Sequence, residues 1–594
     1  MSYRRKKLLA LFCATALSMT AVAGCTGTKS STGNVVSSET ETNAEETSAQ
    51  SEAGTFSSAD MFTERDLAGT YEESGAVYVT LSDDGITGET DGVVIKGQMV
   101  TITAEGTYIF SGTLSEGQIV VDADNAKVQI VFDNVDITCA SSAAVYVKSA
   151  EKVFVTLAEG SQNTLRNTDE YVAIDDNNID AVIFSKSDLT LNGTGSLTIV
   201  SAEGHGIVSK DDLKIIGGTY DITAAGHALS GKDSVRIADG TFILTAEKDG
   251  IHAENADDEE KGYIYIADGD FTITSDGDGM DASNIVQIED GTFDITAGGG
   301  AANSLKTHES DVPGGPGGGM PQNGEKLDGE SMPQMGEKPD GENMPQDTTT
   351  DESGTSTKGI KAGGGMYLNG GTYQIDSADD SIHSNANITI ADGTYTLATG
   401  DDGVHADDAL IVNGGTITVT ESYEGLEGLA VTINDGTIDI TASDDGINTA
   451  GEKMELNGGY IHILAGGDGL DSNGDLTING GEIYIDGPSD NGNSAIDYGD
   501  RSSAYVNGGT LVAIGSSGMA EVMSDSSKQK VLMVKLGEQM EAGNVVLTDS
   551  EGNVIVSYTA LKTYDCVIIS TAEVESGATY TLTTSGTTTE VTAE

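Results

Sequence analysis

The chain has 594 residues, with 96 acidic and only 29 basic side chains, so its formal net charge is −67. This charge excludes proteins that bind nucleic acid or anionic lipid through a basic surface. Disorder throughout the chain is also excluded, because 37% of the residues are hydrophobic and they recur at regular intervals.

Residues 1–24 have the features of a secretory signal peptide. Basic residues precede an apolar run that ends at Val22-Ala23-Gly24-Cys25. This ending resembles the lipobox of bacterial lipoproteins, in which the cysteine is lipidated and becomes the first residue of the mature protein. The resemblance implies a lipid anchor at Cys25 that holds the protein on the outer face of the cell membrane. An ordinary cleaved signal peptide is the alternative.

The next segments are a predicted linker and a predicted β-rich region. Residues 25–65 are mostly Ser, Thr, Glu, Gly and Asn, a composition that predicts a flexible tether. Residues 66–190 contain apolar β-type runs without a clear repeat, and we expect an N-terminal cap and the first coils of a repetitive fold there.

Residues 191–520 carry the strongest signal, an internal repeat with a period near 22 residues. A Gly-Gly-Thr or Asp-Gly-Thr turn, with minor variants, recurs eleven times between Gly217 and Gly508. Around each turn, apolar residues alternate with polar ones, which is the period of a β-strand and excludes a helical repeat. Glycine suits the turn because it adopts positive φ without strain. The pattern predicts an all-β fold, a parallel β-helix of stacked coils.

Two parts of the chain depart from the repeat. An insertion at about residues 303–357 holds six of the seven prolines of the chain, and its composition predicts a disordered loop. Residues 521–594 lose the repeat but keep apolar β-type runs, which predict a small antiparallel β unit. Such a unit would close the open end of the stack, which otherwise invites aggregation.

In most coils a carboxylate lies two residues before an apolar position, and a second polar residue, in several coils also a carboxylate, lies directly after it. Stacking would place these like charges about 4.8 Å apart, so we expect cations to lie between them. Calcium suits such a site because it accepts six to eight oxygen ligands. The predicted metal ligands are Asp249, Asp278, Asp281, Asp380, Asp402, Asp445, Asp468 and Asp471.

Simpler explanations of the same residues remain open. Asp-Gly is good turn chemistry, so each Asp could serve chain reversal on a solvated face. The Asp spacing does not match an EF-hand. His252, His383, His405 and Lys361 fall directly after the apolar position and are candidate ligand-binding residues. His383 and His405 could bind a transition metal or a sugar, or could simply face solvent.

Several segments resemble a family of carbohydrate-binding β-helix domains of clostridial surface proteins, which is related in shape to polysaccharide lyases. They include Asp188-Leu-Thr-Leu-Asn-Gly-Thr-Gly-Ser-Leu197, His205-Gly-Ile-Val-Ser-Lys-Asp-Asp-Leu213 and the repeated Asp-Gly-Ile and Gly-Gly-Thr coils. The resemblance covers roughly residues 70–590. It implies a right-handed parallel β-helix, bound calcium and recognition of plant-type or acidic polysaccharides, without a fixed set of calcium ligands.

Three functions compete at this point. We expect a calcium-dependent polysaccharide-binding protein on the cell surface, without catalytic activity and of unknown oligomeric state. Outward Tyr265, Tyr367, Tyr484 and Tyr505 are candidates for stacking on sugars. The alternatives are a structural adhesive rod and a polysaccharide lyase or hydrolase. For a lyase the candidate bases are sparse and form no recognisable constellation: Lys210, Arg236, Lys248 and Lys361.

Overall fold

The computed structural model describes residues 55–172, 175–306, 356–499 and 501–593. The predicted signal peptide, Cys25, most of the predicted tether and residues 307–355 of the predicted insertion lie outside these ranges. Within them, no helix combines the length and the apolar character needed to cross a membrane.

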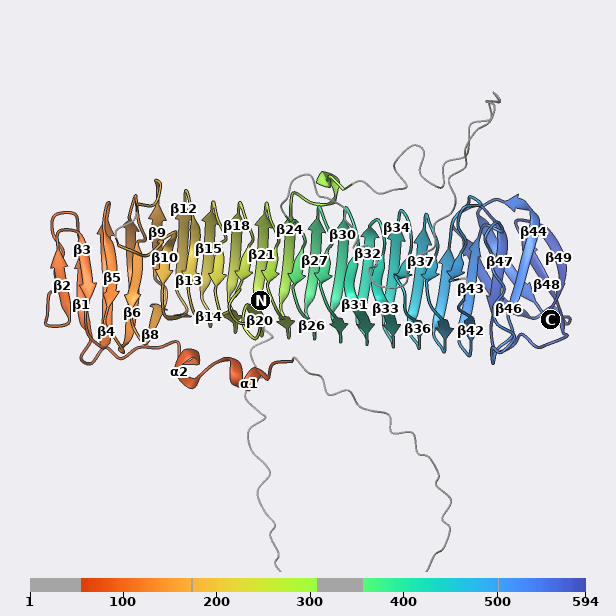
Figure 1. Cartoon of the computed structure of the whole chain (residues 1–594), viewed down its shortest axis with the longest axis horizontal. Coiled ribbons are helices and arrows are strands. Elements are labelled where there is room, and N and C mark those ends of the chain that lie inside the picture. Colours follow the sequence, from red (N-terminus) through yellow and green to blue (C-terminus); the bar gives the residue numbers. More distant parts are fainter. Residues whose placement is uncertain (1–54, 173–174, 307–355, 500, 594) are drawn as a thin grey trace, which may run out of the picture. The chain divides into compact units, whose positions relative to one another are not determined.

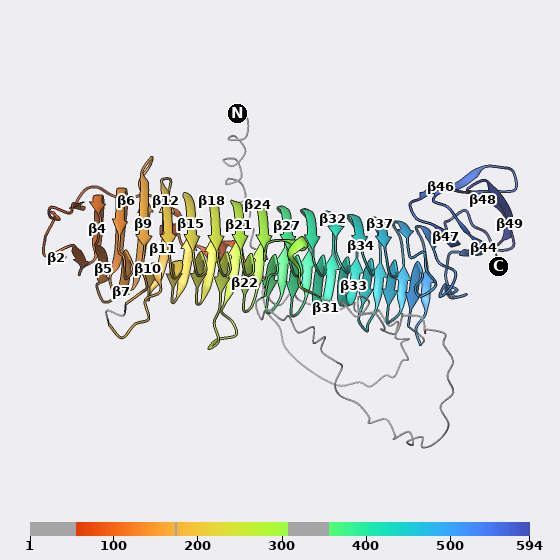
Figure 2. The same ribbon diagram turned by 90° about the horizontal axis from the view of Figure 1, so that it is seen from above.

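Most of the described chain folds into three rows of strands, and each strand pairs in parallel with the next strand of its own row (Figures 1 and 2). One coil contributes one strand to each row, so neighbours in a row are about 22 residues apart in the regular repeats. The predicted all-β class is confirmed, and the long, mostly parallel sheet is consistent with a β-helix or solenoid.

The rows differ in strand length. The first row consists mostly of three-residue strands: β10 (Ala181–Ser185), β13 (His205–Ser209), β16 (Leu229–Gly231), β19 (Ile251–Ala253), β22 (Met280–Ala282), β25 (Ile360–Ala362), β28 (Ile382–Ser384), β31 (Val404–Val412), β33 (Leu426–Ile433), β35 (Ile447–Thr449), β38 (Leu470–Ser472) and β41 (Ile496–Tyr498). In two coils the first-row strand continues into the second row, as β31 and β33.

The second and third rows flank the glycine turns. The second row holds β11 (Asp188–Gly193), β14 (Asp212–Ile215), β17 (Ser234–Ile237), β20 (Tyr263–Ile266), β23 (Val286–Ile288), β26 (Met366–Leu368), β29 (Ile388–Ile390), β36 (Met454–Leu456), β39 (Leu476–Ile478) and β42 (Ala504–Val506). The third row holds β12 (Ser196–Ser201), β15 (Thr219–Ala224), β18 (Thr241–Ala246), β21 (Asp270–Ser275), β24 (Thr292–Ala297), β27 (Thr372–Ser377), β30 (Thr394–Thr399), β32 (Thr416–Glu421), β34 (Thr437–Ala442), β37 (Tyr460–Ala465), β40 (Glu482–Asp486) and β43 (Thr510–Gly515).

The predicted turns are confirmed by backbone geometry. At each of the eleven turns the second residue of the triplet is a glycine with positive φ, between 84° at Gly459 and 145° at Gly240. A side chain would be strained in this conformation. A Cβ at Gly415 would also lie 2.8 Å from the Gly393 carbonyl oxygen of the preceding coil.

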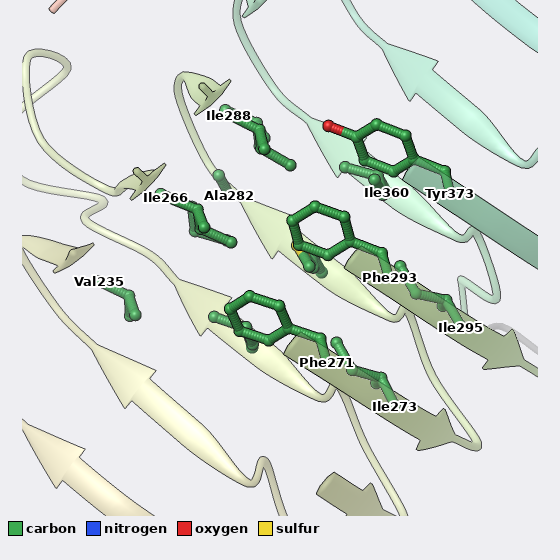
Figure 3. Packing of buried hydrophobic residues seen from close by; sticks show 14 of the residues in the cluster. Val235, Ile266, Phe271, Ile273, Ala282, Ile288, Phe293, Ile295, Ile360 and Tyr373 are labelled. Atoms are coloured by element: carbon green, nitrogen blue, oxygen red, sulfur yellow. The ribbon is translucent and has the colours of Figure 1, made fainter. Parts of the chain in front are cut away.

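The interior is one continuous hydrophobic cluster along the stacked coils. Its most regular feature is a stack of six aromatic rings in the third row, with neighbouring centroids 4.6–5.3 Å apart and planes within 10° of parallel. Figure 3 shows three of these rings, Phe271, Phe293 and Tyr373, on successive coils. The ring spacing is close to the strand spacing of about 4.8 Å, so each ring fills the space above the one before it.

The described chain before the regular repeat contains two short helices, α1 (Ser58–Met61) and α2 (Glu64–Leu67), and residues 55–65 belong to the predicted tether. These residues pack on the second row: the Phe56 N–H donates to Gln287 Oε1 at 2.6 Å. Tyr265 points out of the coil as predicted, but it is not available for stacking on a sugar, because Phe62 packs on its ring and Tyr265 is fully buried. The first strands are β1 (Val77–Leu81), β2 (Val93–Lys96), β3 (Met99–Ile102), β4 (Gly106–Leu114), β5 (Gln118–Asp122), β6 (Lys127–Thr138), β7 (Val145–Ser149), β8 (Lys152–Leu157) and β9 (Gln162–Asn167).

Antiparallel strands follow the last coil. In the first sheet β47 (Tyr564–Ser570) pairs with β43 and with β44 (Leu532–Met540), so it covers the exposed edge of the third row. A separate four-stranded sheet consists of β46 (Val554–Ala560), β45 (Gly543–Thr548), β48 (Thr579–Thr584) and β49 (Thr587–Thr592). A second hydrophobic cluster joins this sheet to Val512 and Ile514 of β43. A short 3-10 turn, η1 (Ala301–Asn303), precedes the insertion.

Candidate functional site

The first row of strands carries an outer column of polar residues, one at the middle of each short strand. The residues pair in register from coil to coil, and their side chains are mostly half-buried. The column includes all four predicted ligand-binding residues and two of the predicted metal ligands. Its members are Ser230, His252, Asp281, Lys361, His383, His405, Glu427, Asn448, Asp471 and Asp497.

An inner column lies three residues earlier in each coil, where the chain enters the first row. At most of its positions a side-chain atom accepts a hydrogen bond from the backbone N–H of the inner-column residue in the next coil. Asp249 Oδ1 accepts from Asp278 N at 2.9 Å, and Asp445 Oδ1 accepts from Asp468 N at 2.6 Å. The inner-column residues are His205, His227, Asp249, Asp278, Lys358, Asp380, Asp402, Glu424, Asp445, Asp468 and Ser494.

This ladder explains why Asp recurs at the inner position. Asp278 and Asp380 are only 1% and 2% exposed, so their carboxylates are not on a freely solvated face. Each buried carboxylate satisfies a backbone donor of the neighbouring coil, and a buried donor left unpaired would be costly. The inner column therefore has a structural role that does not itself require an ion.

In the middle coils, protein cations neutralise the carboxylates. Lys358 Nζ lies 2.6 Å from Asp380, and His383 Nδ1 lies 2.8 Å from the same carboxylate. Lys361 lies 3.4–3.5 Å from Asp278 and Asp281. His405 Nδ1 lies 3.0 Å from Asp402 and 2.9 Å from Glu427. Four predicted metal ligands therefore have a positively charged or titratable protein partner, namely Asp278, Asp281, Asp380 and Asp402.

Further along the columns, towards the C-terminus, the carboxylates no longer have cationic partners. Asp445, Asp468 and Asp471, here called the acidic cluster, have carboxylate oxygens that all lie within 4.8 Å of one another. Among the described residues, no Lys, Arg or His forms an ion pair with them. Burial, together with neighbouring carboxylates, raises the pKa of Asp445 to about 8, that of Asp468 to about 7 and that of Asp471 to about 6. Beside them, the buried Oδ1 of Asn448 has no hydrogen-bond partner.

At the other end of the columns, basic groups gather around a cavity of about 380 Å³, here called the imidazole pocket. Its lining includes three imidazoles, from His205, His227 and His252, and three lysines, Lys210, Lys232 and Lys248. The rings form a stack, with centroids 4.9 Å apart between His205 and His227 and 4.1 Å apart between His227 and His252. The remaining predicted metal ligand, Asp249, lies beneath this stack, 3.0 Å from His227 and from His252.

The imidazole pocket corrects one interpretation of the sequence. In the sequence Lys210 and Lys248 form no recognisable constellation, but in the structure both line this pocket together with the stacked imidazoles. Arg236 is held elsewhere, by two 2.9 Å contacts to Asp212. The signal that could have revealed the pocket was present: His205 and His227 are 22 residues apart, at the inner-column position of consecutive coils.

The acidic cluster predicts an unusual pH dependence of stability in the absence of divalent cations. An Asp in the unfolded chain has a pKa of about 3.9, so the folded protein binds the protons of Asp445, Asp468 and Asp471 more tightly. Stability from these groups is therefore greatest below about pH 4 and falls as pH rises towards about 8. We expect Asp445→Asn, which cannot ionise, to melt at a higher temperature than the wild type at pH 8.5.

This difference between the variant and the wild type should shrink towards pH 5, because Asp445 of the wild type is then protonated. Melting followed by circular dichroism in chelator from pH 5 to pH 8.5 measures it. A difference in melting temperature that does not change with pH would show that repulsion between the carboxylates of the acidic cluster does not destabilise the fold.

Comparisons with known proteins place this repetitive β fold in a carbohydrate-binding family. A family model described as "Carbohydrate-binding domain-containing protein" matches residues 96–403 and 401–575. The chain belongs to this family. The predicted resemblance to a clostridial carbohydrate-binding family is confirmed, and the lipid anchor stays a prediction.

Two relatives can be described individually. A carbohydrate-binding domain-containing protein from Acetivibrio thermocellus is 42% identical over 135 residues, which make up 22% of this chain and 47% of the relative. The chain thus matches about half the length of that relative. A solved structure of a polysaccharide lyase-like protein from C. thermocellum, a gadolinium derivative, is 37% identical and has a TM-score of 0.37. It covers 38% of this chain and 92% of the solved chain.

Proposed function

We propose that this chain is a polysaccharide-binding protein of the cell surface, held by a lipid on Cys25, whose binding of acidic or plant cell-wall glycans depends on calcium. The family supports carbohydrate as the ligand class. The proposal includes a right-handed parallel β-helix as the scaffold, supported by the parallel pairing of strands from successive coils.

The observation that carries the calcium dependence is the acidic cluster. Its three carboxylates are brought together by the fold, and no described protein cation neutralises them. The donors are oxygens, which calcium prefers, and the unpaired Oδ1 of Asn448 adds a neutral oxygen beside them. Asp445, Asp468 and Asp471 would hold the ion. When bound, calcium supplies positive charge that attracts the carboxylate of an acidic sugar.

The outer column supplies a surface along which a glycan would lie. Its polar side chains repeat at the strand spacing of about 4.8 Å, and they run from Ser230 to Asp497 without a break in register. Half-buried side chains held by neighbours on both sides lose little freedom on binding, which favours recognition of an extended chain. An acidic glycan would be repelled by this column wherever carboxylates lack a partner, so a cation at the acidic cluster is needed.

The proposal is for binding without catalysis. A lyase that uses calcium needs a base close to the ion, to remove the proton next to the sugar carboxylate. Among the described residues, no Lys or Arg forms an ion pair with the acidic cluster. The unpaired lysines Lys210 and Lys248 belong to the imidazole pocket, which lies many coils away.

Retention on immobilised polysaccharide tests the proposal. We expect the purified chain to bind polygalacturonate in millimolar calcium and to be released by a chelator. Release should be reversed when calcium is restored, and magnesium should restore less binding because it demands tighter octahedral geometry. Binding that chelator leaves unchanged would exclude the calcium bridge. Release of unsaturated uronate, measured by ultraviolet absorbance, would contradict the proposal that the protein binds its glycan without catalysis.

A further inference from the structure

We propose that the imidazole pocket is a second glycan subsite, which binds the carboxylate group of an acidic sugar through protein donors and without calcium. This inference rests on the proposed function for its ligand class. It assigns to the pocket a role that the acidic cluster cannot perform, because the cluster repels anions unless a cation is bound.

The backbone ladder determines which nitrogen of the His205 imidazole carries a proton. The backbone N–H of His227 donates to Nδ1 of His205 at 2.8 Å. An Nδ1 that accepts cannot also carry hydrogen, so this neutral ring must be protonated at Nε2. Burial lowers the pKa of His205 to about 3, which keeps the ring neutral. His227 differs, because its Nδ1 lies 3.0 Å from the Asp249 carboxylate as well as 3.2 Å from the Asp249 backbone N, so the ladder does not fix its tautomer.

His205 therefore presents an N–H donor to the pocket. Its Nε2 has no hydrogen-bond partner among the described residues and is not a fully enclosed atom. The His227 ring stacks on it, with planes within 2° of parallel and centroids 4.9 Å apart, which holds the His205 ring in place. A carboxylate, with two oxygens that only accept, matches this donor and the nearby ammonium groups better than a neutral sugar hydroxyl does.

The charges of the pocket also favour an anion. Its lining contains two carboxylates, and each has a cationic partner: Asp257 lies 2.7 Å from Lys232, and Glu254 lies 3.5 Å from His252. Lys210 and Lys248 are exposed and form no ion pair with any described residue. In a chain with a net charge of −67, two ammonium groups without an ion pair, beside the neutral N–H donor of His205, form a site complementary to an oxyanion.

The pocket and the acidic cluster are separate along the columns. Eight inner-column steps lead from His227 to Asp468, which is about 40 Å at the strand spacing of about 4.8 Å. The two sites can therefore be tested independently with a short oligomer in chelator, because the cluster then has no calcium and cannot contribute.

The experiment is titration of the full chain with trigalacturonate in chelator, followed by isothermal calorimetry, with a neutral trisaccharide as the negative ligand. We expect the wild type to bind trigalacturonate and Lys210→Ala/Lys248→Ala to bind it at least about tenfold more weakly. His205→Asn retains an oxygen to accept the His227 N–H but lacks the Nε2 donor, and it should also bind more weakly, by about three- to tenfold.

A matched control is Lys127→Ala/Lys453→Ala, which removes the same charge from two exposed lysines outside the pocket. It should bind like the wild type. Equal affinity of Lys210→Ala/Lys248→Ala and the wild type would overturn the inference, as would the absence of trigalacturonate binding in chelator. Neither result would affect calcium-dependent retention on polygalacturonate, which is measured separately, so the failure of one proposal can be distinguished from the failure of the other.

Discussion

Asp445→Asn is expected to remove about half of the calcium-dependent stabilisation of this protein while making the calcium-free protein more stable. The asparagine keeps an oxygen that accepts the Asp468 N–H, so the ladder stays intact and only charge is lost. Without calcium, the substitution removes one of three mutually repelling carboxylates. With calcium, it removes a charged ligand, and calcium affinity depends strongly on the number of such ligands.

The size of the effect follows from binding linkage. Calcium at 100 times its dissociation constant stabilises the folded state by about 2.7 kcal/mol, and a tenfold loss of affinity reduces this to about 1.4 kcal/mol. Thermal melting in chelator measures the expected gain in stability without calcium, and melting at a fixed calcium concentration measures the expected loss of calcium-induced stabilisation. The weaker calcium affinity should also raise the calcium concentration needed to retain the protein on polygalacturonate.

Asp249→Asn is the matched control, because it is the same substitution at the same inner-column position. Asp249 lies between His227 and His252, and its contacts with these imidazoles lower its pKa despite burial. Its charge is therefore stabilising, so Asp249→Asn should lower the melting temperature in chelator. The calcium-induced shift should not change. A reduced calcium shift in Asp249→Asn, or an unchanged one in Asp445→Asn, would contradict the placement of the ion.

Asp66→Ala is expected to detach the two N-terminal helices from the coils. Asp66 is completely buried, and its Oδ1 lies 2.6 Å from Lys152 Nζ and 2.8 Å from the hydroxyl of Thr190. Removing one partner of a buried ion pair costs about 3–5 kcal/mol, because the other charge is left uncompensated. Limited proteolysis should then cleave near residues 55–70 far faster than in the wild type.

The same ion pair should make the attachment sensitive to acid. Burial by itself would raise the pKa of Asp66, but hydrogen bonds from Lys152 and Thr63 outweigh it and lower the pKa to about 2. The stabilisation is therefore complete above about pH 4, the ordinary Asp pKa, and is lost as pH falls towards 2. Asp66→Ala/Lys152→Met, which removes both charges, should recover much of the lost protection. No recovery would mean that the helices are held by other contacts.

The repeat was readable from the sequence because its determinants are local. Each glycine turn and its alternating neighbours lie within about a dozen residues, so Gly218 and the buried Tyr220 and Ile222 follow from one short segment. The positions of the candidate site were equally readable, because the columns repeat with the coils.

The partners of those positions were not readable. Whether a carboxylate faces a lysine, a histidine or another carboxylate depends on residues one or more coils away, as with Asp281 and Lys361, which are 80 residues apart in the sequence. The contacts of the N-terminal segment could not be predicted either, because its partners lie still further away in the sequence. Phe56 bonds to a residue 231 positions later, and nothing in the polar composition around it indicates that Tyr265 is covered.

The insertion is flanked by coils that are direct neighbours. Asp281 pairs in register with Lys361, and Val286 with Met366, as closely as in any uninterrupted pair of coils. Closing a longer loop costs little, about 0.6 kcal/mol for each doubling of its length. The stability of the core therefore depends little on the length of this segment, so it can be shortened or extended in evolution or by design while the polar columns stay in register.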